Sequence, residues 1–483
     1  MRGSLKSRLA TCTLTAALLG FAPALAQEVA VESPARLRVT TTSEEAARHF
    51  WTGIGDARNI FFSRAIMHFD RAIALDGELG LARVARAVFA PGLTSDQRKA
   101  EVDRGLAAMT SATTGELVTA LAFREFVAGN TRQTHMLFKT ASKMLPGDPA
   151  LAFYAAQTTT GVEGPLRGRE ALREVTEKFP DDAATYNILA YTSWQTGDRP
   201  AALAAVKRYV ELAPDHPNPH DSYAELLQWD RRFSEALAHY GRAIALDSSY
   251  TEAYIGTAEV LQLMGRGAEA RRQIEAAITR APSTPTRINY MRAVAHSFLL
   301  DGRLKEGMDR LAAAARDAQA DNRDGIAAQA HRQMALADAT LGRGSAIAAH
   351  LKAAAEIGGV DAPEQLATVA VAHGTAGDLP TARKAAEQLA TAAQTRTQFA
   401  GASHAANAVI LLRENKAKEA LAELAGVEGD DPLVRALRAE CHRAMGNVAE
   451  ARTLRDQVLG NPEYSLIDLY QTLARMRAAR VKV

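Results

Sequence analysis

The chain has almost no cysteine and few aromatic residues. Its two cysteines are Cys12 and Cys441, and Phe, Trp and Tyr together make up 6% of the 483 residues. Because Cys12 lies in a predicted signal peptide, only Cys441 would remain, which we expect to be a buried, inert thiol with no disulfide partner. Runs of alternating polarity rich in β-branched and aromatic residues are also rare, which argues against a β-sheet. Ala and Leu, which favour helices, dominate the apolar composition, so we expect an all-α protein.

The first 26 residues have the pattern of a secretory signal peptide. Three basic residues precede a mostly apolar stretch, 9–21, and small residues ending at Ala26 form a cleavage site. A retained membrane anchor would need roughly 20 uninterrupted apolar residues, and this stretch is shorter. A lipoprotein acylated at Cys12 is the other alternative, which Thr11 and the long apolar stretch after Cys12 disfavour. We expect cleavage after Ala26 and a soluble product that is periplasmic or secreted.

The mature chain would also have no excess of charge of either sign. Without the three basic residues of the signal peptide, 54 Lys and Arg stand against 55 Asp and Glu. Nucleic-acid binding depends mainly on neutralising phosphates with basic residues, so we expect no nucleic-acid partner. No other stretch is apolar enough to cross a bilayer, so we expect no integral membrane segment after removal of the signal.

One spacing recurs in the middle of the chain. Residues 34 positions apart form three series, which are Pro180, Pro214, Ser248 and Pro282, then Ala202, Ala236 and Ala270, then Val206, Tyr240 and Ile274. A fixed step of this size indicates stacked supersecondary units, each of which buries its apolar face against its neighbours. In the unit 181–214 we expect a first helix at 183–195, a break at Gly197 and a second helix from Pro200 to about Leu212.

These features resemble the tetratricopeptide repeat (TPR). The resemblance rests on small residues at the helix crossing, a turn glycine, an aromatic residue near the first-helix start and a closing proline, as in Ala190, Ala224, Ala258, Gly197, Tyr186, Tyr254 and Pro214. It is specific over 181–316 and looser over about 49–460, which at this repeat size gives about nine to eleven helix pairs. It implies an all-α, right-handed superhelical solenoid of antiparallel helix pairs.

The chain then divides into six parts. We expect a signal peptide (1–26), an extended leader (27–42) ending near a helix-capping Ser43, N-terminal TPR-like repeats (43–180), the best-defined array (181–316), degenerate C-terminal repeats (317–460) and a capping helix (461–483). Helix–helix turns are expected at Gly302, Gly342, Gly377, Asn415 and Gly446. The last helix is predicted to be a cap because a terminal repeat would otherwise expose one apolar side.

Common catalytic spacings are missing from the sequence. There is no HExxH, Walker loop, GxGxxG or GxSxG pattern, and the glycine–serine cluster 342–345 fits a turn between helices. His216 and His220, each beside an aspartate (Asp215 and Asp221), could hold zinc, but two intervening prolines break the helical register that would bring the rings together. We therefore expect no catalytic residue, cofactor or metal.

The functional prediction comes from the resemblance. In TPR proteins the first helices line the concave side and grip an extended peptide or a partner's helix. The corresponding residues here are Asn187, Tyr191, Trp194, Gln195, Asp221, Glu225, Gln228, Glu252, Glu259 and Gln262. The alternative interpretation is that Tyr191 and Trp194 pack between repeats and the carboxylates form a solvated face. Family members that clamp a C-terminal carboxylate use Lys, Arg and Asn there, so the acidic face disfavours that ligand.

The sequence therefore predicts an exported, non-catalytic TPR scaffold that binds a protein or peptide through its concave face, with assembly or regulation of a cell-envelope complex as its role. The alternatives are a hydrolase-type enzyme or metal-binding protein with a site on inter-repeat loops at His216, His220 and Asp221, a self-assembling structural array, and a small-molecule binder. Oligomeric state does not follow from these residues.

Overall fold

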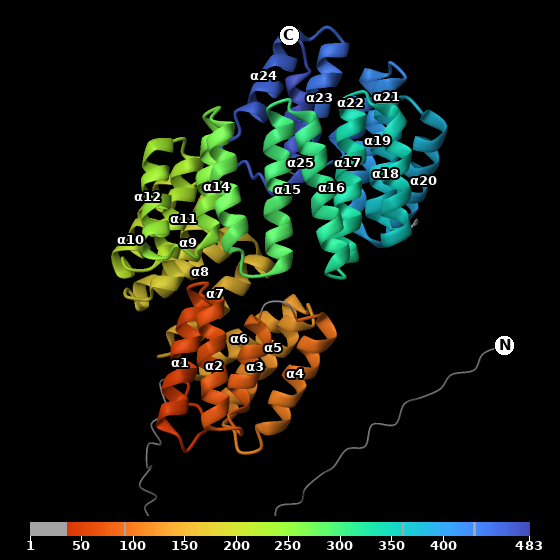
Figure 1. Ribbon diagram of the computed structural model, residues 1–483. Coiled ribbons are helices and arrows are strands. Elements are labelled where there is room, and N and C mark those ends of the chain that lie inside the picture. Colours follow the sequence, from red (N-terminus) through yellow and green to blue (C-terminus); the bar gives the residue numbers. More distant parts are fainter. Residues whose placement is uncertain (1–35, 91–92, 360–361, 428–430) are drawn as a thin grey trace, which may run out of the picture.

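Helices alone build the part of the chain that the structure describes. A computed structural model describes residues 36–90, 93–359, 362–427 and 431–483, so the predicted signal peptide and residues 27–35 of the leader lie outside it. Within these ranges the chain forms 25 α-helices, one short 3-10 helix and no strand. The first 24 helices pack in consecutive pairs (Figure 1). The predicted all-α solenoid is confirmed, with twelve pairs where we expected about nine to eleven.

Of the first four pairs, the first three form the lower part of the molecule in Figure 1, and the fourth lies above them. The helices of the four pairs are α1 (Glu44–Arg58), α2 (Phe62–Leu75), α3 (Gly80–Phe89), α4 (Ser95–Ala108), α5 (Thr114–Val127), α6 (Thr131–Met144), α7 (Pro149–Glu163) and α8 (Pro165–Lys178). As expected, Ser43 caps α1, since its Oγ accepts from the Ala46 amide at 3.1 Å. The described end of the leader, residues 36–42, contains no helix, and it is tied to the repeats because the Leu37 amide donates to Asp148 Oδ2 at 3.0 Å.

The next four pairs contain the regular array. Their helices are α9 (Ala183–Gln195), α10 (Arg199–Leu212), α11 (Pro217–Trp229), α12 (Phe233–Leu246), α13 (Thr251–Leu263), α14 (Gly267–Arg280), α15 (Thr284–Leu300) and α16 (Leu304–Ala320). Every alanine predicted at the crossings of α9 to α14 is fully buried. The fit is close at Gly256, where an added Cβ would lie 2.2 Å from the ring of Tyr240. Such contact explains why small residues recur at the crossings.

The last four pairs carry the looser repeats. Their helices are α17 (Asp324–Thr340), α18 (Gly344–Gly358), α19 (Pro363–Ala376), α20 (Leu379–Thr395), α21 (Ala400–Arg413), α22 (Ala417–Ala425), α23 (Pro432–Ala444) and α24 (Val448–Leu459), with a 3-10 helix, η1 (Thr397–Phe399), before α21. The four turns predicted here have positive φ, at Gly342, Gly377, Asn415 and Gly446, as does the predicted turn at Gly302 between α15 and α16. The cluster 342–345 is such a turn, as expected.

The solenoid bends far enough for its first pair to touch the fifth and sixth. Arg58, at the end of α1, donates to Asp182 Oδ2 before α9 at 2.6 Å, and both side chains are nearly buried. The hydroxyl of Tyr209 in α10 donates to Asn59 Oδ1 at 3.1 Å, and the ring of Phe61 lies 5.0 Å from that of His216. These contacts fix the curvature between segments more than 100 residues apart.

The final helix, α25 (Leu469–Ala479), has a larger role than that of a cap. It packs on α23 and α24, as a cap of the last pair would, but it also packs on α15 and α17. Leu473 and Met476 join an apolar cluster with Leu299 and Leu336. Figure 1 shows the blue end of the chain beside the green helix α15. The C-terminus therefore links the array to the later repeats.

Candidate functional site

A segment of the same chain lies across the helix face that was predicted to bind a partner. We call the face formed by α9, α11, α13 and α15 the channel, and residues 460–468, which connect α24 to α25, the C-terminal segment. Side chains from each of the four helices, together with one from the turn after α11, hydrogen-bond to this segment. These partners are 170 to 269 residues apart in sequence.

Four of the contacts reach main-chain atoms of the C-terminal segment. Arg231 Nη2 donates to the Gly460 carbonyl at 2.5 Å, and Gln228 Nε2 donates to the Pro462 carbonyl at 3.0 Å. At Leu466 the amide donates to Glu259 Oε1 at 2.9 Å, while its carbonyl oxygen lies 2.7 Å from His296 Nδ1. Burial lowers the pKa of His296 to about 4, so the ring is neutral and Nδ1–H donates to that carbonyl. Contacts of this kind recognise an extended backbone whatever its sequence.

Side chains of the C-terminal segment add the specific contacts. Trp194 Nε1 donates to Glu463 Oε1 at 2.9 Å, and the Ser465 hydroxyl donates to Glu259 Oε1 at 2.8 Å. Tyr464 and Leu466 are 2% and 0% exposed and pack into the apolar cluster of α13 and α15. Fully burying two such side chains contributes roughly 1.5–3 kcal/mol each. These two residues anchor the segment.

Arg231 has a strained backbone at the point where it holds the segment. Residues 197, 231 and 265 occupy the same turn in three successive repeats, and each has positive φ, with Gly at 197 and 265 but Arg at 231. A residue with a Cβ costs of order 1 kcal/mol or more in this conformation. The arginine in place of glycine supplies the guanidinium that binds the Gly460 carbonyl, so the strain accompanies a specific contact.

Carboxylates form the floor of the channel. Burial, reinforced by the neighbouring Glu225, Glu252 and Glu259, raises the pKa of Asp221 well above its usual range. Burial also raises the pKa of Glu225, against the effect of the Tyr191 hydroxyl, which donates to Glu225 Oε2 at 2.5 Å. For Glu259, burial raises the pKa to about 8, although hydrogen bonds from Ser465 and Leu466 act in the opposite direction. At pH 7 the Glu259 carboxyl is therefore mostly protonated, and burial disfavours the charged forms of Asp221 and Glu225.

The ten residues predicted to bind a partner divide by what they contact. Trp194, Gln228 and Glu259 hold the C-terminal segment. The other seven do not hydrogen-bond to it. Tyr191 and Glu225 bond each other, and Gln262 bonds Ser297 and Asp301. Gln195 and Glu252 are exposed, Asp221 is partly buried, and Asn187 is the seventh. Asn187 is 1% exposed and its amide atoms have no hydrogen-bond partner among the described residues. Their binding to an external partner stays a prediction.

Three features of the channel were not predicted. Neither Arg231 nor His296 was predicted to bind a partner, and residues 461–468 were assigned to a terminal capping helix. Arg231 had one readable signal, which is an arginine in the place of the turn glycine of the neighbouring repeats. The C-terminal segment had none, because contacts between residues some 200 positions apart leave no periodic pattern.

The two histidines considered as metal ligands, His216 and His220, lie against different neighbours. His220 Nδ1 lies 3.1 Å from His239 Nδ1, and its Nε2 lies 3.1 Å from the Pro214 carbonyl oxygen. His216 instead packs against Phe61. Within the described ranges no group of three or more His, Cys, Asp or Glu side chains is placed to hold a metal ion. Cys441 is fully buried, as expected, and burial raises the pKa of its thiol to about 12.

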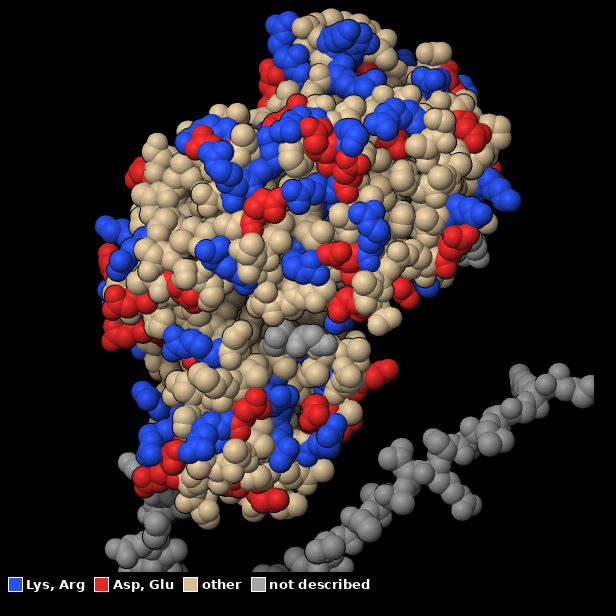
Figure 2. Space-filling model, in the orientation of Figure 1, with Lys and Arg blue, Asp and Glu red and all other residues tan. Residues whose placement is uncertain are grey.

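The visible surface of the molecule carries charges of both signs. Figure 2 shows basic and acidic side chains interspersed over the visible face, without a continuous basic stripe. The helices of the described residues are all too short or too polar to traverse a bilayer.

Comparison with known proteins gives matches among solved structures alone. No family model and no curated protein matches the chain. It is similar to TTC0263, a thermophilic TPR protein of Thermus thermophilus, with 21% identity over 37% of this chain and 97% of that chain and a TM-score of 0.32. It is also similar to MamA (16% identity, 33% and 94% covered, TM-score 0.30) and to YrrB, described as a TPR protein with an unusual peptide-binding site (12% identity, 35% and 88% covered, TM-score 0.28). The 34-residue helix–turn–helix period of α9 to α14 confirms the resemblance to the tetratricopeptide repeat at the level of fold.

Proposed function

We propose that this chain is an exported, non-catalytic scaffold whose channel binds an extended segment of a protein partner in place of its own residues 460–468. The observation that carries the proposal is a set of hydrogen bonds between channel side chains and main-chain atoms of the C-terminal segment. The channel side chains are those of Arg231, Gln228, Glu259 and His296, and the main-chain atoms belong to Gly460, Pro462 and Leu466. Export rests on the signal-peptide pattern of residues 1–26, and a role in a cell-envelope complex rests on that location.

The internal segment indicates what a partner must offer. Tyr464 and Leu466 are two residues apart and both enter the apolar cluster, while Glu463 bonds Trp194. A competing segment would be extended, with an acidic residue followed directly by an aromatic residue and an aliphatic residue two positions after it. Burial raises the pKa of Asp221 and of Glu259, which lowers the negative charge of the floor and disfavours a strongly basic ligand.

Competition with the internal segment would set the affinity. A tethered segment faces its site at an effective concentration that is typically millimolar for short flexible links. An external segment with the same contacts therefore binds weakly until the internal one is released. This makes the channel a site that opens to a partner with better anchors or to one present at high concentration.

A peptide of residues 460–468, labelled with a fluorophore, tests the proposal. We expect it to bind a full-length variant with Tyr464→Ala and Leu466→Ala at least tenfold more tightly than it binds the native chain, because the variant's own segment has lost its two anchors. The control peptide carries the same two alanines and should bind neither protein. Fluorescence polarisation measures binding, and circular dichroism checks that the variant stays helical.

A folded variant that does not bind the peptide would contradict the proposal. If the double variant is unstable, the single Glu463→Ala variant, which loses only the contact with Trp194, should bind the peptide more tightly than the native chain does. Equal, negligible binding by both proteins would also count against an exchangeable occupant.

A further inference from the structure

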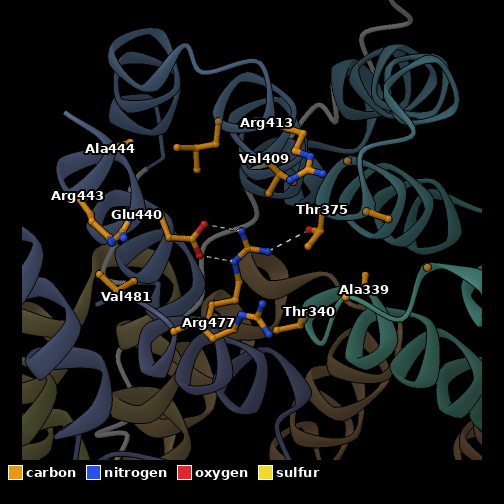
Figure 3. A pocket seen from close by; sticks show the side chains of 16 residues that line it. Ala339, Thr340, Thr375, Val409, Arg413, Glu440, Arg443, Ala444, Arg477 and Val481 are labelled. Carbon is orange, nitrogen blue, oxygen red and sulfur yellow. Dashed lines mark hydrogen bonds and ion pairs between the residues drawn. The ribbon is translucent and has the colours of Figure 1, made fainter. Parts of the chain in front are cut away.

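A second opening lies away from the channel, at the ends of five helices. The last turns of α17, α19, α21, α23 and α25 and the turns after them enclose a cleft of about 640 Å³. Figure 3 shows its side chains converging from these helices. Sites for small ligands are typically about 300–1,000 Å³. The cleft is therefore large enough for a small molecule, and it shares no residue with the C-terminal segment.

The lining of this cleft is strongly basic. Four arginines line it, which are Arg413, Arg443, Arg477 and Arg480, against one acidic residue, Glu440. Arg477 is 8% exposed and forms a bidentate pair with Glu440, with Nε–Oε1 and Nη2–Oε2 distances of 2.8 Å each, while its Nη1 donates to Thr375 Oγ1 at 3.1 Å (Figure 3). This pair neutralises the carboxylate and leaves three positive charges uncompensated.

The three remaining arginines have guanidinium N–H groups without an acceptor among the described residues. Arg443 uses Nε for the Lys482 carbonyl at 3.0 Å. The guanidinium groups of Arg413 and Arg480 have no hydrogen-bond or ion-pair partner among the described residues, although the main-chain amide of Arg480 donates to the Arg477 carbonyl. In Figure 3, Arg413 and Arg443 lie on opposite sides of the Arg477–Glu440 pair. A planar guanidinium binds the paired oxygens of phosphate or carboxylate with two parallel hydrogen bonds.

The position of Arg413 depends on a glycine. Gly377, the turn residue after α19, has φ of 98°, and a Cβ there would lie 3.0 Å from Arg413 Nε and Nη2. The guanidinium thus rests directly on backbone that only glycine leaves uncovered. Beside it, an added Cβ at Gly342 would meet no atom within 4 Å, so the cleft is open near this turn.

We propose that this cleft binds a small oxyanion with two or more negative charges, held by Arg413, Arg443 and Arg480 around the Arg477–Glu440 pair. The proposal is independent of partner binding in the channel. Positive side chains also stabilise helix C-termini through the helix dipole, and that role alone would need no ligand. The two explanations differ in whether an added anion binds saturably.

Isothermal titration of the purified full-length protein with pyrophosphate, at constant ionic strength, tests the site. We expect saturable binding of one pyrophosphate per chain with a Kd below about 1 mM, and at least tenfold weaker binding by the variant Arg413→Gln with Arg480→Gln. The matched control, Arg167→Gln with Arg173→Gln on α8, removes the same charge from an exposed surface outside the cleft and should bind as the native chain does.

A parallel titration with citrate identifies the source of the anion. Binding of pyrophosphate alone assigns a phosphate compound, and binding of both assigns small polyanions, including polycarboxylates. An absence of saturable binding of either probe to the native chain would overturn the proposal, as would equal binding by the two double variants. A loss of thermal stability in the Arg413 and Arg480 variant without any ligand effect would leave helix stabilisation as the whole role of these residues.

Discussion

Glu259→Gln isolates the buried carboxylate that holds the C-terminal segment. Glu259 Oε1 accepts hydrogen bonds from the Ser465 hydroxyl at 2.8 Å and from the Leu466 amide at 2.9 Å. A glutamine carbonyl oxygen in the same place can accept both bonds. The substitution therefore keeps the contacts and removes only the ability of this side chain to ionise.

The sign of the effect follows from the direction of the pKa shift. Burial raises the pKa of Glu259 from 4.5 to about 8, so the folded protein binds this proton more tightly than the unfolded chain does. Its contribution to stability is fully present below pH 4.5 and is lost as the pH rises through about 8. Relative to acidic pH, a shift of this size lowers the free energy of unfolding at pH 7 by roughly 3 kcal/mol at most. We expect the variant to equal the native chain in stability at acidic pH and to exceed it by about 1–3 kcal/mol near pH 8.

Urea unfolding followed by circular dichroism, repeated between about pH 5 and pH 8, measures this difference. Glu235→Gln is the control, because Glu235 is exposed and its bond with Arg232 lowers its pKa, so that variant should gain nothing at alkaline pH. A Glu259→Gln variant that is less stable than the native chain near pH 8, or a difference that does not change with pH, would refute the reasoning.

Three further predictions concern packing, and each is checked by the change in the free energy of unfolding. Leu466→Ala should cost about 2–5 kcal/mol, because the side chain is fully buried; a loss under about 1 kcal/mol would mean that the segment is not anchored. Gly256→Ala should cost about 1–3 kcal/mol, since its Cβ would lie 2.2 Å from the tyrosine ring of α12, whereas Gly241→Ala, with nothing within 4 Å, should stabilise by about 0.5–1 kcal/mol. Arg58→Ala should cost about 3–5 kcal/mol by removing the ionic partner of the nearly buried Asp182, which would keep only its hydrogen bond from the Thr185 hydroxyl; a neutral result would contradict the contact between the first and fifth pairs.

The helix pairs were predictable because their cause is local. A break at Gly197, a proline in the first turn of α10 and small residues at the crossings act within one 34-residue unit, and α9 spans the predicted residues 183–195. The later turns, such as Gly377 and Asn415, were also found, because each needs a residue that accepts positive φ. Periodicity therefore predicts the array and the positions of its turns.

The contents of the channel were not predictable in the same way. The first helices were expected to present Trp194, Gln228 and Glu259, and the structure places all three at the channel. Their bonding partners come from residues 462–466, which the local pattern assigned to a cap. Pairing between distant segments depends on the curvature of the whole solenoid, and a repeat pattern does not specify that curvature.

Hydrogen–deuterium exchange of the full-length protein, followed by mass spectrometry of peptides covering residues 460–468, tests the central claim most directly. An amide bound to Glu259, as that of Leu466 is, can exchange only when the segment leaves the channel. The account predicts protection of Leu466 close to that of α11, together with faster exchange in the Tyr464→Ala and Leu466→Ala variant. Exchange of residues 460–468 at the rate of an unstructured peptide in the native chain would contradict it.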